Sequence, residues 1–170
     1  MKFALFTGCV AKGATREAMI STQKAAEALG IEFVEMKSAA CCGAGVLSEQ
    51  SPILADALNA RTFAIAEEQN LDLITICSTC QGVLKKSECH INGDSEYKEK
   101  INHLLSEGGH QYMGGKSKIK HFANILATEE GLNLLREKVK HPLTGLKTAA
   151  FYGCYVLRPS ELSEYKDPDN

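Results

Sequence analysis

The sequence predicts an α/β domain in which a parallel sheet carries helices on both faces. Three observations support this fold class: short apolar runs alternate with longer amphipathic segments, Gly or Pro marks several boundaries, and three apolar runs each lead to a cysteine. Alternation of this kind is typical of βαβ units, in which helices connect parallel strands. With 170 residues and 44% hydrophobic content, the chain is long enough for one domain with a sizeable core.

The first half of the chain predicts two strands and two helices in alternation. Residues 2–6 form a short apolar run, as expected of a buried parallel strand. Residues 15–29 place apolar side chains on one helical face, which indicates a helix. Residues 31–36 alternate apolar and acidic side chains, as a half-buried strand does. Residues 51 to about 70 form a second helix, since the Ser-Pro pair at its start supplies an N-cap and a first helical position.

The second half continues the same alternation. The clearest strand is residues 71–76, in which Leu, Ile and Thr follow one another with a single early charge. The later segments are predicted from periodicity and from the turn signals at Asn92-Gly93-Asp94 and around residues 108–115. They are a helix from Cys77 to about Cys89, a helix over 94–106 with Tyr97, Ile101, Leu104 and Leu105 inward, a strand over 118–122, a helix over 125–139 and a last strand over 146–152.

The last of these strands repeats the first. Lys2 to Cys9 matches Lys147 to Cys154 at Lys, Ala, Phe, Gly and Cys, which is five of eight positions. A repeat at this spacing suggests a duplicated domain. We therefore divide the chain into a first cysteine-rich domain at 1–145 and the start of a truncated second copy at 146–170. The chain is either a natural short protein or a fragment of a protein nearly twice as long.

Composition and charge exclude several classes of function. The net charge is −2 and no run of Lys and Arg stands out, so there is no basic surface for nucleic acid or anionic membrane. No apolar run reaches the roughly 20 residues that a membrane span needs. The first residues contain no secretory hydrophobic region and no cleavage site. We expect a cytoplasmic protein that does not span the membrane.

Five of the seven cysteines form a pattern that suggests metal ligation or redox chemistry. Cys9 is separated by 31 residues from the vicinal pair Cys41-Cys42, and 34 residues separate that pair from Cys77-Ser78-Thr79-Cys80. Adjacent cysteines rarely bridge each other, because the small ring needs strained geometry. A reducing compartment also keeps thiols free. Since ligands of parallel sheets bind at the carboxyl ends of the strands, these five side chains are expected to lie together.

Two kinds of metal centre suit thiolates in this arrangement. A structural zinc site uses four ligands and usually two Cys-x-x-Cys segments, of which this chain has one. An iron–sulfur cluster accepts thiolates from widely separated loops, but an ordinary cubane cluster takes four cysteines and leaves the fifth unexplained. Both alternatives stay open from the residues alone. Cys89 and His90 are expected to have surface or packing roles, because Cys89 comes nine positions after Cys80 and helical spacing does not favour the same face.

The cysteine pattern resembles a known family. Cys9, Cys41-Cys42-Gly43 and Cys77-Ser78-Thr79-Cys80 resemble the cysteine-rich CCG motif, which occurs twice in the B-type subunit of heterodisulfide reductase. Related proteins belong to succinate dehydrogenase, thiol:fumarate reductase, glycolate oxidase and lactate-utilisation systems. The segment from Gly153 to Pro159 resembles the start of that family's second copy. The chain therefore looks like one copy and the opening of another.

The resemblance implies a cofactor, a reaction and partners. It implies a non-cubane [4Fe-4S] cluster held by Cys9, Cys41, Cys42, Cys77 and Cys80, with Cys154 a ligand of a second site where a full second copy is present. Gly43 and Gly45 would let the backbone approach the cluster. The implied function is electron transfer to a disulfide such as that of coenzyme M and coenzyme B, in a complex with a ferredoxin-like iron–sulfur subunit and a flavin-containing subunit.

Two alternative functions accompany this interpretation. The first is a non-catalytic module that binds a cluster or anchors a partner in a succinate, fumarate or 2-hydroxy acid oxidoreductase, such as one for glycolate or lactate. The second is a structural zinc site in the same cysteines.

Overall fold

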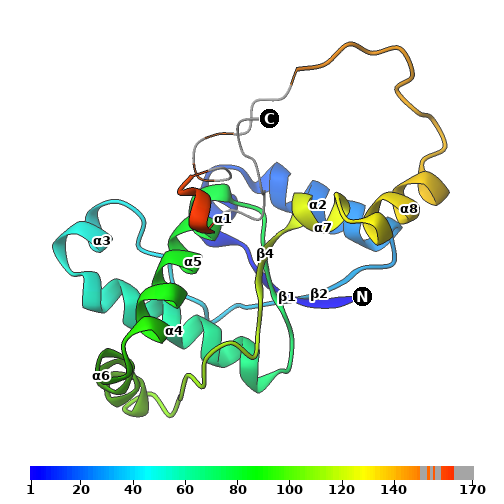
Figure 1. Cartoon of the computed structure of the whole chain (residues 1–170). Helices are drawn as coiled ribbons and strands as arrows, with labels where there is room; N and C mark the ends of the chain where they lie inside the picture. The colour runs from blue at the N-terminus through cyan, green and yellow to red at the C-terminus, as the bar shows by residue number, and fades with distance from the viewer. Residues whose placement is uncertain (150–152, 154, 156–157, 163–170) are drawn as a thin grey trace.

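The fold is built on one sheet of four parallel strands. The computed structural model describes residues 1–149, 153, 155 and 158–162. In the described chain the sheet has the order β2-β1-β3-β4, and its strands are β1 (Lys2–Phe6), β2 (Glu32–Glu35), β3 (Leu73–Thr75) and β4 (Ile119–His121). Strands β1 and β3 are the central pair, with Ala4 opposite Leu73 and Phe6 opposite Thr75. The parallel sheet confirms the predicted fold class (Figure 1).

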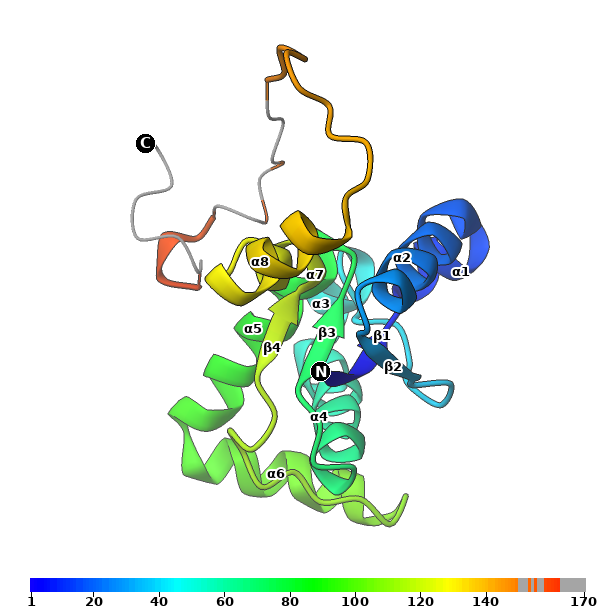
Figure 2. The ribbon, with the colours of Figure 1, turned by 90° about the vertical axis from the view of Figure 1, so that its right-hand side faces the viewer.

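Helices connect every pair of successive strands. The described helices are α1 (Gly8–Gly13), α2 (Arg16–Ala28), α3 (Val46–Gln50), α4 (Pro52–Glu68), α5 (Ser78–Gly93), α6 (Ser95–Ser106), α7 (Phe122–Leu126), α8 (Glu129–Lys138) and the 3-10 turn η1 (Ser160–Leu162). Figure 1 shows α4, α5 and α6 on one side of the sheet and α2, α7 and α8 on the other. Figure 2, turned by 90°, shows β3 and β4 side by side with their arrowheads toward the same end.

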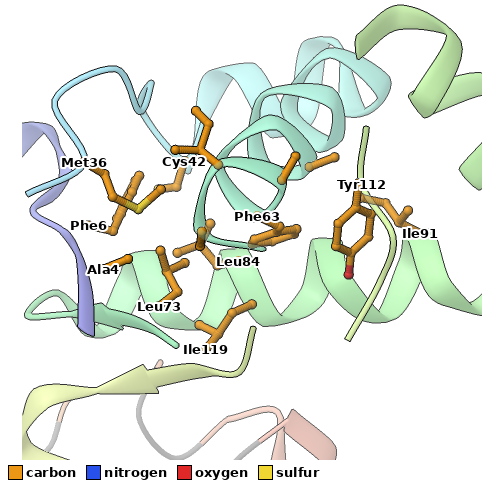
Figure 3. Packing of buried hydrophobic residues seen from close by; sticks show 14 of the residues in the cluster. Ala4, Phe6, Met36, Cys42, Phe63, Leu73, Leu84, Ile91, Tyr112 and Ile119 are labelled. Atoms are coloured by element: carbon orange, nitrogen blue, oxygen red, sulfur yellow. The ribbon is translucent and has the colours of Figure 1, made fainter. Parts of the chain in front are cut away.

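Two apolar cores fill the spaces between the sheet and these helix layers. The larger core joins Phe6 and Leu73 of the sheet to Phe63 of α4 and Leu84 of α5, all at most 3% exposed. Figure 3 shows Cys42 beside Met36 toward one end of this core and Tyr112 toward the other. The second core joins the opposite sheet face to α2 and α7. Burial of apolar surface on both faces is what requires near-continuous apolar strands.

Most elements lie where the sequence predicted them. The strand over 2–6 and the helices over 15–29 and 51–70 are confirmed within two residues at each end. The predicted strands over 31–36, 71–76 and 118–122 exist but are shorter, because only residues that face a neighbouring strand complete the hydrogen-bonded ladder. The helix after Cys77 is confirmed and runs four residues further than expected, to Gly93. Asp94 then caps α6, since its carboxylate accepts the amide hydrogens of Glu96 and Tyr97.

The predicted helix over 125–139 is wrong, since two helices meet there. Thr128 ends α7 and begins α8, because its hydroxyl donates to the Ile125 carbonyl and accepts the amide hydrogen of Gly131. Helix α8 begins so close to the end of α7 that a Cβ at position 131 would collide with the Ile125 carbonyl oxygen. A Thr that caps by its side chain looks, in the sequence, like an ordinary polar position within a helix.

Three further differences concern short or exposed segments. Helices α1 and α3 were not predicted, since five or six residues are too few to display helical periodicity. Leu104 is 46% exposed, whereas Ile101 and Leu105 of the same helix are buried as predicted. Of the predicted strand over 146–152, residues 146–149 are exposed and form no strand, because no neighbouring strand pairs with them. Residues 150–152 lie outside the described residues.

Over the residues that the structure describes, no helix combines the length and the apolar character needed to cross a bilayer.

Candidate metal centre

The carboxyl ends of three strands bring the five predicted cysteines to one edge of the sheet. Cys9 follows β1 in the first turn of α1, and Cys77 and Cys80 follow β3 at the start of α5. Cys41 and Cys42 lie in the loop between β2 and α3. Because β1 lies between β2 and β3, the ends of these three strands are neighbours. The topology thus places the five thiols around one point of the molecule.

The sulfur atoms form two close pairs. Cys41 Sγ lies 3.7 Å from Cys9 Sγ, and Cys42 Sγ lies 3.5 Å from Cys80 Sγ. Two thiolates on one tetrahedral metal, each at about 2.3 Å from it, lie roughly 3.8 Å apart. Both pairs have nearly this spacing. The vicinal cysteines therefore have different partners, with the Cys41 sulfur beside Cys9 of α1 and the Cys42 sulfur beside Cys80 of α5.

Helix α5 begins at Cys77, the thiol that belongs to neither of the two pairs. Cys77 is its N-cap, and the Cys77 sulfur accepts the backbone amide hydrogen of Cys80 at 3.5 Å. The first turn of a helix presents free N–H groups and the positive end of the helix dipole, both of which stabilise a thiolate. The Cys77 amide itself donates to the Thr75 hydroxyl at the end of β3. Strand end and helix start together fix this sulfur.

The thiols of Cys41, Cys42, Cys77 and Cys80 differ in pKa. The hydrogen bond with Cys80 is the main factor that lowers the pKa of Cys42 and of Cys77, each to about 6. The same two bonds, together with burial, raise the pKa of Cys80. The Gly43 N–H lowers the pKa of Cys41, but burial and the Cys9 sulfur outweigh it and the pKa is raised. Cys42 and Cys77 thus lose their protons more readily than Cys41 and Cys80, and a thiol must lose its proton to bind a metal.

Three glycines with a positive φ lie in the segments that carry these cysteines, and Gly8 is the one that lies against a sulfur. Gly8 has φ +72°, and a Cβ placed on it would lie 3.0 Å from the Cys80 sulfur. Gly43 is buried at φ +78° and packs against Leu47 and Ala55. Gly45 has φ +84°, is exposed and precedes α3. The backbone at all three positions is in the left-handed region, which favours glycine.

We expect Gly8→Ala to destabilise the fold and to displace Cys80. A left-handed conformation costs an L residue roughly 1–2 kcal/mol, and the new methyl group presses on the Cys80 sulfur. Urea denaturation should show the lower free energy of unfolding, and thiol accessibility should rise at Cys80. Gly13→Ala is the matched control, since Gly13 has open space around it within the same short segment. Equal losses in both variants would contradict the role given to Gly8.

A small cavity of about 150 Å³ opens beside Cys9 and Cys41. Phe6, Met36 and Ala39 form its apolar wall, and Lys12 brings a positive charge to its rim while it pairs with Glu35 at 3.6 Å. A larger hollow of about 690 Å³ lies elsewhere, between the start of β1 and α8, and its lining contains no thiol. The chemistry of the donor atoms, and not cavity size, therefore marks the candidate site.

Other cysteines and histidines stay apart from this group. Cys89 is exposed on α5, and His90 bonds the Asp56 carboxylate at 2.8 Å. Tyr97 donates to the same carboxylate at 2.8 Å, and the His90 ring stacks on the Tyr97 ring at 4.4 Å. The packing roles predicted for Cys89 and His90 agree with these contacts. Cys154 lies outside the described residues.

The sequence did not single out the polar residues behind the vicinal pair. Asn59 of α4 is 1% exposed, and its amide donates to the Cys42 carbonyl at 3.1 Å and to the Ser87 hydroxyl at 2.9 Å. The one signal in the sequence was an Asn among the Ala and Phe residues that form the apolar face of α4. Nothing in the local sequence shows which distant backbone group such a side chain bonds.

The donor atoms at this edge of the sheet are thiols. Within the part of the chain that the structure describes, no group of three or more His, Cys, Asp or Glu side chains is arranged to hold a metal ion. The sulfurs stand instead as the pairs Cys9 with Cys41 and Cys42 with Cys80, and Cys77 is linked to the second pair. Soft thiolate donors select iron–sulfur clusters and zinc among biological metal groups.

Comparison with known proteins gives one family and several relatives. Residues 3–85 match a family model described as a cysteine-rich domain, CCG, and this range contains all five thiols. The membrane anchor subunit of 8-methylmenaquinol:fumarate reductase from Wolinella succinogenes is 38% identical over 160 residues, 94% of this chain and 55% of that protein. A protein from Archaeoglobus profundus, named as similar to the B-type subunit of heterodisulfide reductase, is 32% identical over 170 residues, 99% of this chain and 56% of that protein.

A third relative has a more specific name. The B-type subunit of the ferredoxin/F(420)H(2)-dependent CoB-CoM heterodisulfide reductase from Methanosarcina acetivorans is 30% identical over 161 residues, 94% of this chain and 53% of that protein. The chain spans about half the length of the curated relatives that it matches.

Proposed function

Because residues 3–85 form a cysteine-rich domain of the CCG family, we propose that this chain is the iron–sulfur subunit, or part of it, of a heterodisulfide reductase-like complex. The observation that supports the proposal is that five thiols lie together at the ends of three strands. Four of them form two close sulfur pairs, and the fifth, Cys77, is the N-cap of α5. In this proposal Cys9, Cys41, Cys42, Cys77 and Cys80 hold a non-cubane [4Fe-4S] cluster. Such a cluster, when bound, supplies electrons one at a time, and two electrons with two protons reduce a disulfide to two thiols.

The residues of the chain have distinct tasks in this proposal. Cys42 and Cys80 hold the buried side of the metal group, since they are 2% and 5% exposed. Cys9 and Cys41 are exposed and mark the side from which a disulfide substrate approaches. Lys12 at the rim of the adjoining cavity supplies a positive charge there. The electron donor would be a ferredoxin-like subunit, with a flavin-containing subunit in the same cytoplasmic complex.

A second candidate function has its own support. The relative with 38% identity is named as the membrane anchor subunit of a fumarate reductase. In this alternative the same thiols hold a cluster, but the chain attaches a reductase to its site of action and does not itself reduce a disulfide. A third possibility is a structural zinc ion in place of the cluster.

Metal analysis of the anaerobically purified chain tests the proposed centre. We expect close to four iron atoms and four acid-labile sulfides per chain, as in a [4Fe-4S] cluster. Zinc without sulfide would overturn the proposal in favour of the structural site. The loaded chain would then be assayed with a reduced ferredoxin and the coenzyme M–coenzyme B disulfide, both alone and with its neighbouring subunits. Reduction of the disulfide by the complex supports the heterodisulfide reductase function. Reduction of fumarate with no reduction of the disulfide supports the anchoring function.

A further inference from the structure

The vicinal cysteines are connected to the core through one buried side chain. Asn59 Nδ2 lies 3.1 Å from the Cys42 carbonyl oxygen and 2.9 Å from Ser87 Oγ. Asn59, Cys42 and Ser87 are 1%, 2% and 4% exposed, so water does not compete for these bonds. One amide thus joins α4, α5 and the loop that carries Cys41 and Cys42.

The orientation of this amide follows from its partner. A backbone carbonyl can only accept a hydrogen bond, so the atom facing Cys42 has to be the Asn59 nitrogen. This orientation leaves Asn59 Oδ1 buried without a hydrogen-bond partner among the described residues. A buried acceptor of this kind destabilises a fold. Asn59 therefore donates its amide hydrogen to the Cys42 carbonyl, while its own unpaired oxygen lowers the stability of the fold.

Packing alone does not explain an amide at this position. The buried residues around it on α4 include Ala55, Ala60, Phe63 and Ala64, and an apolar side chain among them would carry no buried oxygen without a partner. The loop that follows Cys42 contains Gly43 and Gly45, both with a positive φ. Glycine restricts the backbone conformation less than other residues do. Ser48 holds the Gly43 carbonyl through both its amide and its hydroxyl. Asn59 holds the carbonyl of the preceding residue, Cys42.

We propose that Asn59 is a positioning residue for the thiol centre. By fixing the Cys42 carbonyl it holds the vicinal pair so that Cys41 faces Cys9 and Cys42 faces Cys80, and Ser87 orients the amide. The inference concerns the loop geometry itself, and its consequence for metal binding rests on the proposed function.

Amide hydrogen exchange of the full chain tests this role with or without metal. In Asn59→Leu we expect exchange in residues 41–45 to become about fivefold faster, the factor for loss of one net hydrogen bond. Thr62→Val is the matched control, because Thr62 is equally buried on α4 and its hydroxyl bonds only within that helix, at Leu58. This control should leave exchange in 41–45 unchanged. Equal exchange in 41–45 for both variants would overturn the proposal.

The metal-loaded chain gives a second readout. Asn59→Leu should change the electron paramagnetic resonance spectrum of the centre and lower its iron content, whereas Thr62→Val should do neither. Ser87→Ala keeps the Asn59 amide but removes the hydroxyl that orients it, so it should change the spectrum and the iron content in the same direction by a smaller amount. This variant replaces Asn59→Leu in the comparison if Asn59→Leu does not fold. An unaltered spectrum in both Asn59→Leu and Ser87→Ala would contradict the role. If the unmodified chain binds no iron, the proposed function fails, while the exchange comparison still decides the inference.

Discussion

Anaerobically purified Cys42→Ser chain is expected to contain almost no iron, while Cys89→Ser chain keeps the iron content of the unmodified protein. Cys42 is buried and pairs with Cys80 at 3.5 Å, so no water can replace its sulfur as a ligand. Loss of a group that only supports a ligand already costs about 10–100-fold in metal affinity, and loss of the ligand itself should cost more. Iron and acid-labile sulfide are measured per chain by colorimetric analysis.

Cys41→Ser should behave like Cys42→Ser, because its sulfur lies 3.7 Å from that of Cys9. Cys89 is the control, since it is an exposed thiol on α5 outside the centre. Each of the three variants loses one thiol, so non-specific oxidation affects them alike. Equal iron content in all three would refute the ligand assignment.

Glu67→Ala is expected to lower the free energy of unfolding by about 3 kcal/mol, since hydrogen bonds to a charged group contribute roughly 1.5–3 kcal/mol each. The Glu67 carboxylate is 7% exposed and accepts the amide hydrogens of Met113, Gly114 and Lys116 at 2.8, 3.1 and 3.2 Å. Its removal leaves these amides without an acceptor and releases the loop that leads into β4. Urea denaturation followed by circular dichroism measures the change.

The neighbouring glutamate provides the control for this experiment. Glu68 pairs with His110 at 3.0 Å, but its side chain is 52% exposed. Exposed ion pairs contribute about 0–1 kcal/mol, so Glu68→Ala should change stability little. If the two substitutions cost the same, the loop does not depend on the buried carboxylate.

Local sequence patterns were sufficient for the sheet and for the position of the thiols. Strands β1 and β3 are short and mostly apolar, and a parallel order follows once helices separate the strands, so Cys9 and Cys77 had to emerge at one edge. The helix that begins after Cys77 was likewise visible from its Cys-x-x-Cys start. These features depend on residues within one turn or one strand of each other.

Features that depend on distant partners were not predicted. Asn59 bonds a carbonyl 17 residues away, and Glu67 bonds amides 46 to 49 residues away. A side chain in a helix does not reveal such partners, because they are chosen by tertiary packing. Leu104 fits the apolar stripe of α6 and is nevertheless exposed, since the core ends at Ile101 and Leu105. Periodicity gives the face of a helix but not the width of the surface that covers it.

The central pairing of β1 with β3 has a consequence for the unfolded chain. Cys9 follows one of these strands and Cys77 the other, while Cys41 and Cys42 lie between them in the sequence. A metal group bound by all of these residues would be a cross-link that closes two loops of 31 and 34 residues. Closing a loop of this length by a cross-link reduces the entropy of the denatured state by the equivalent of about 3–4 kcal/mol. If the proposed metal group is bound, its loss would therefore favour unfolding of the two central strands.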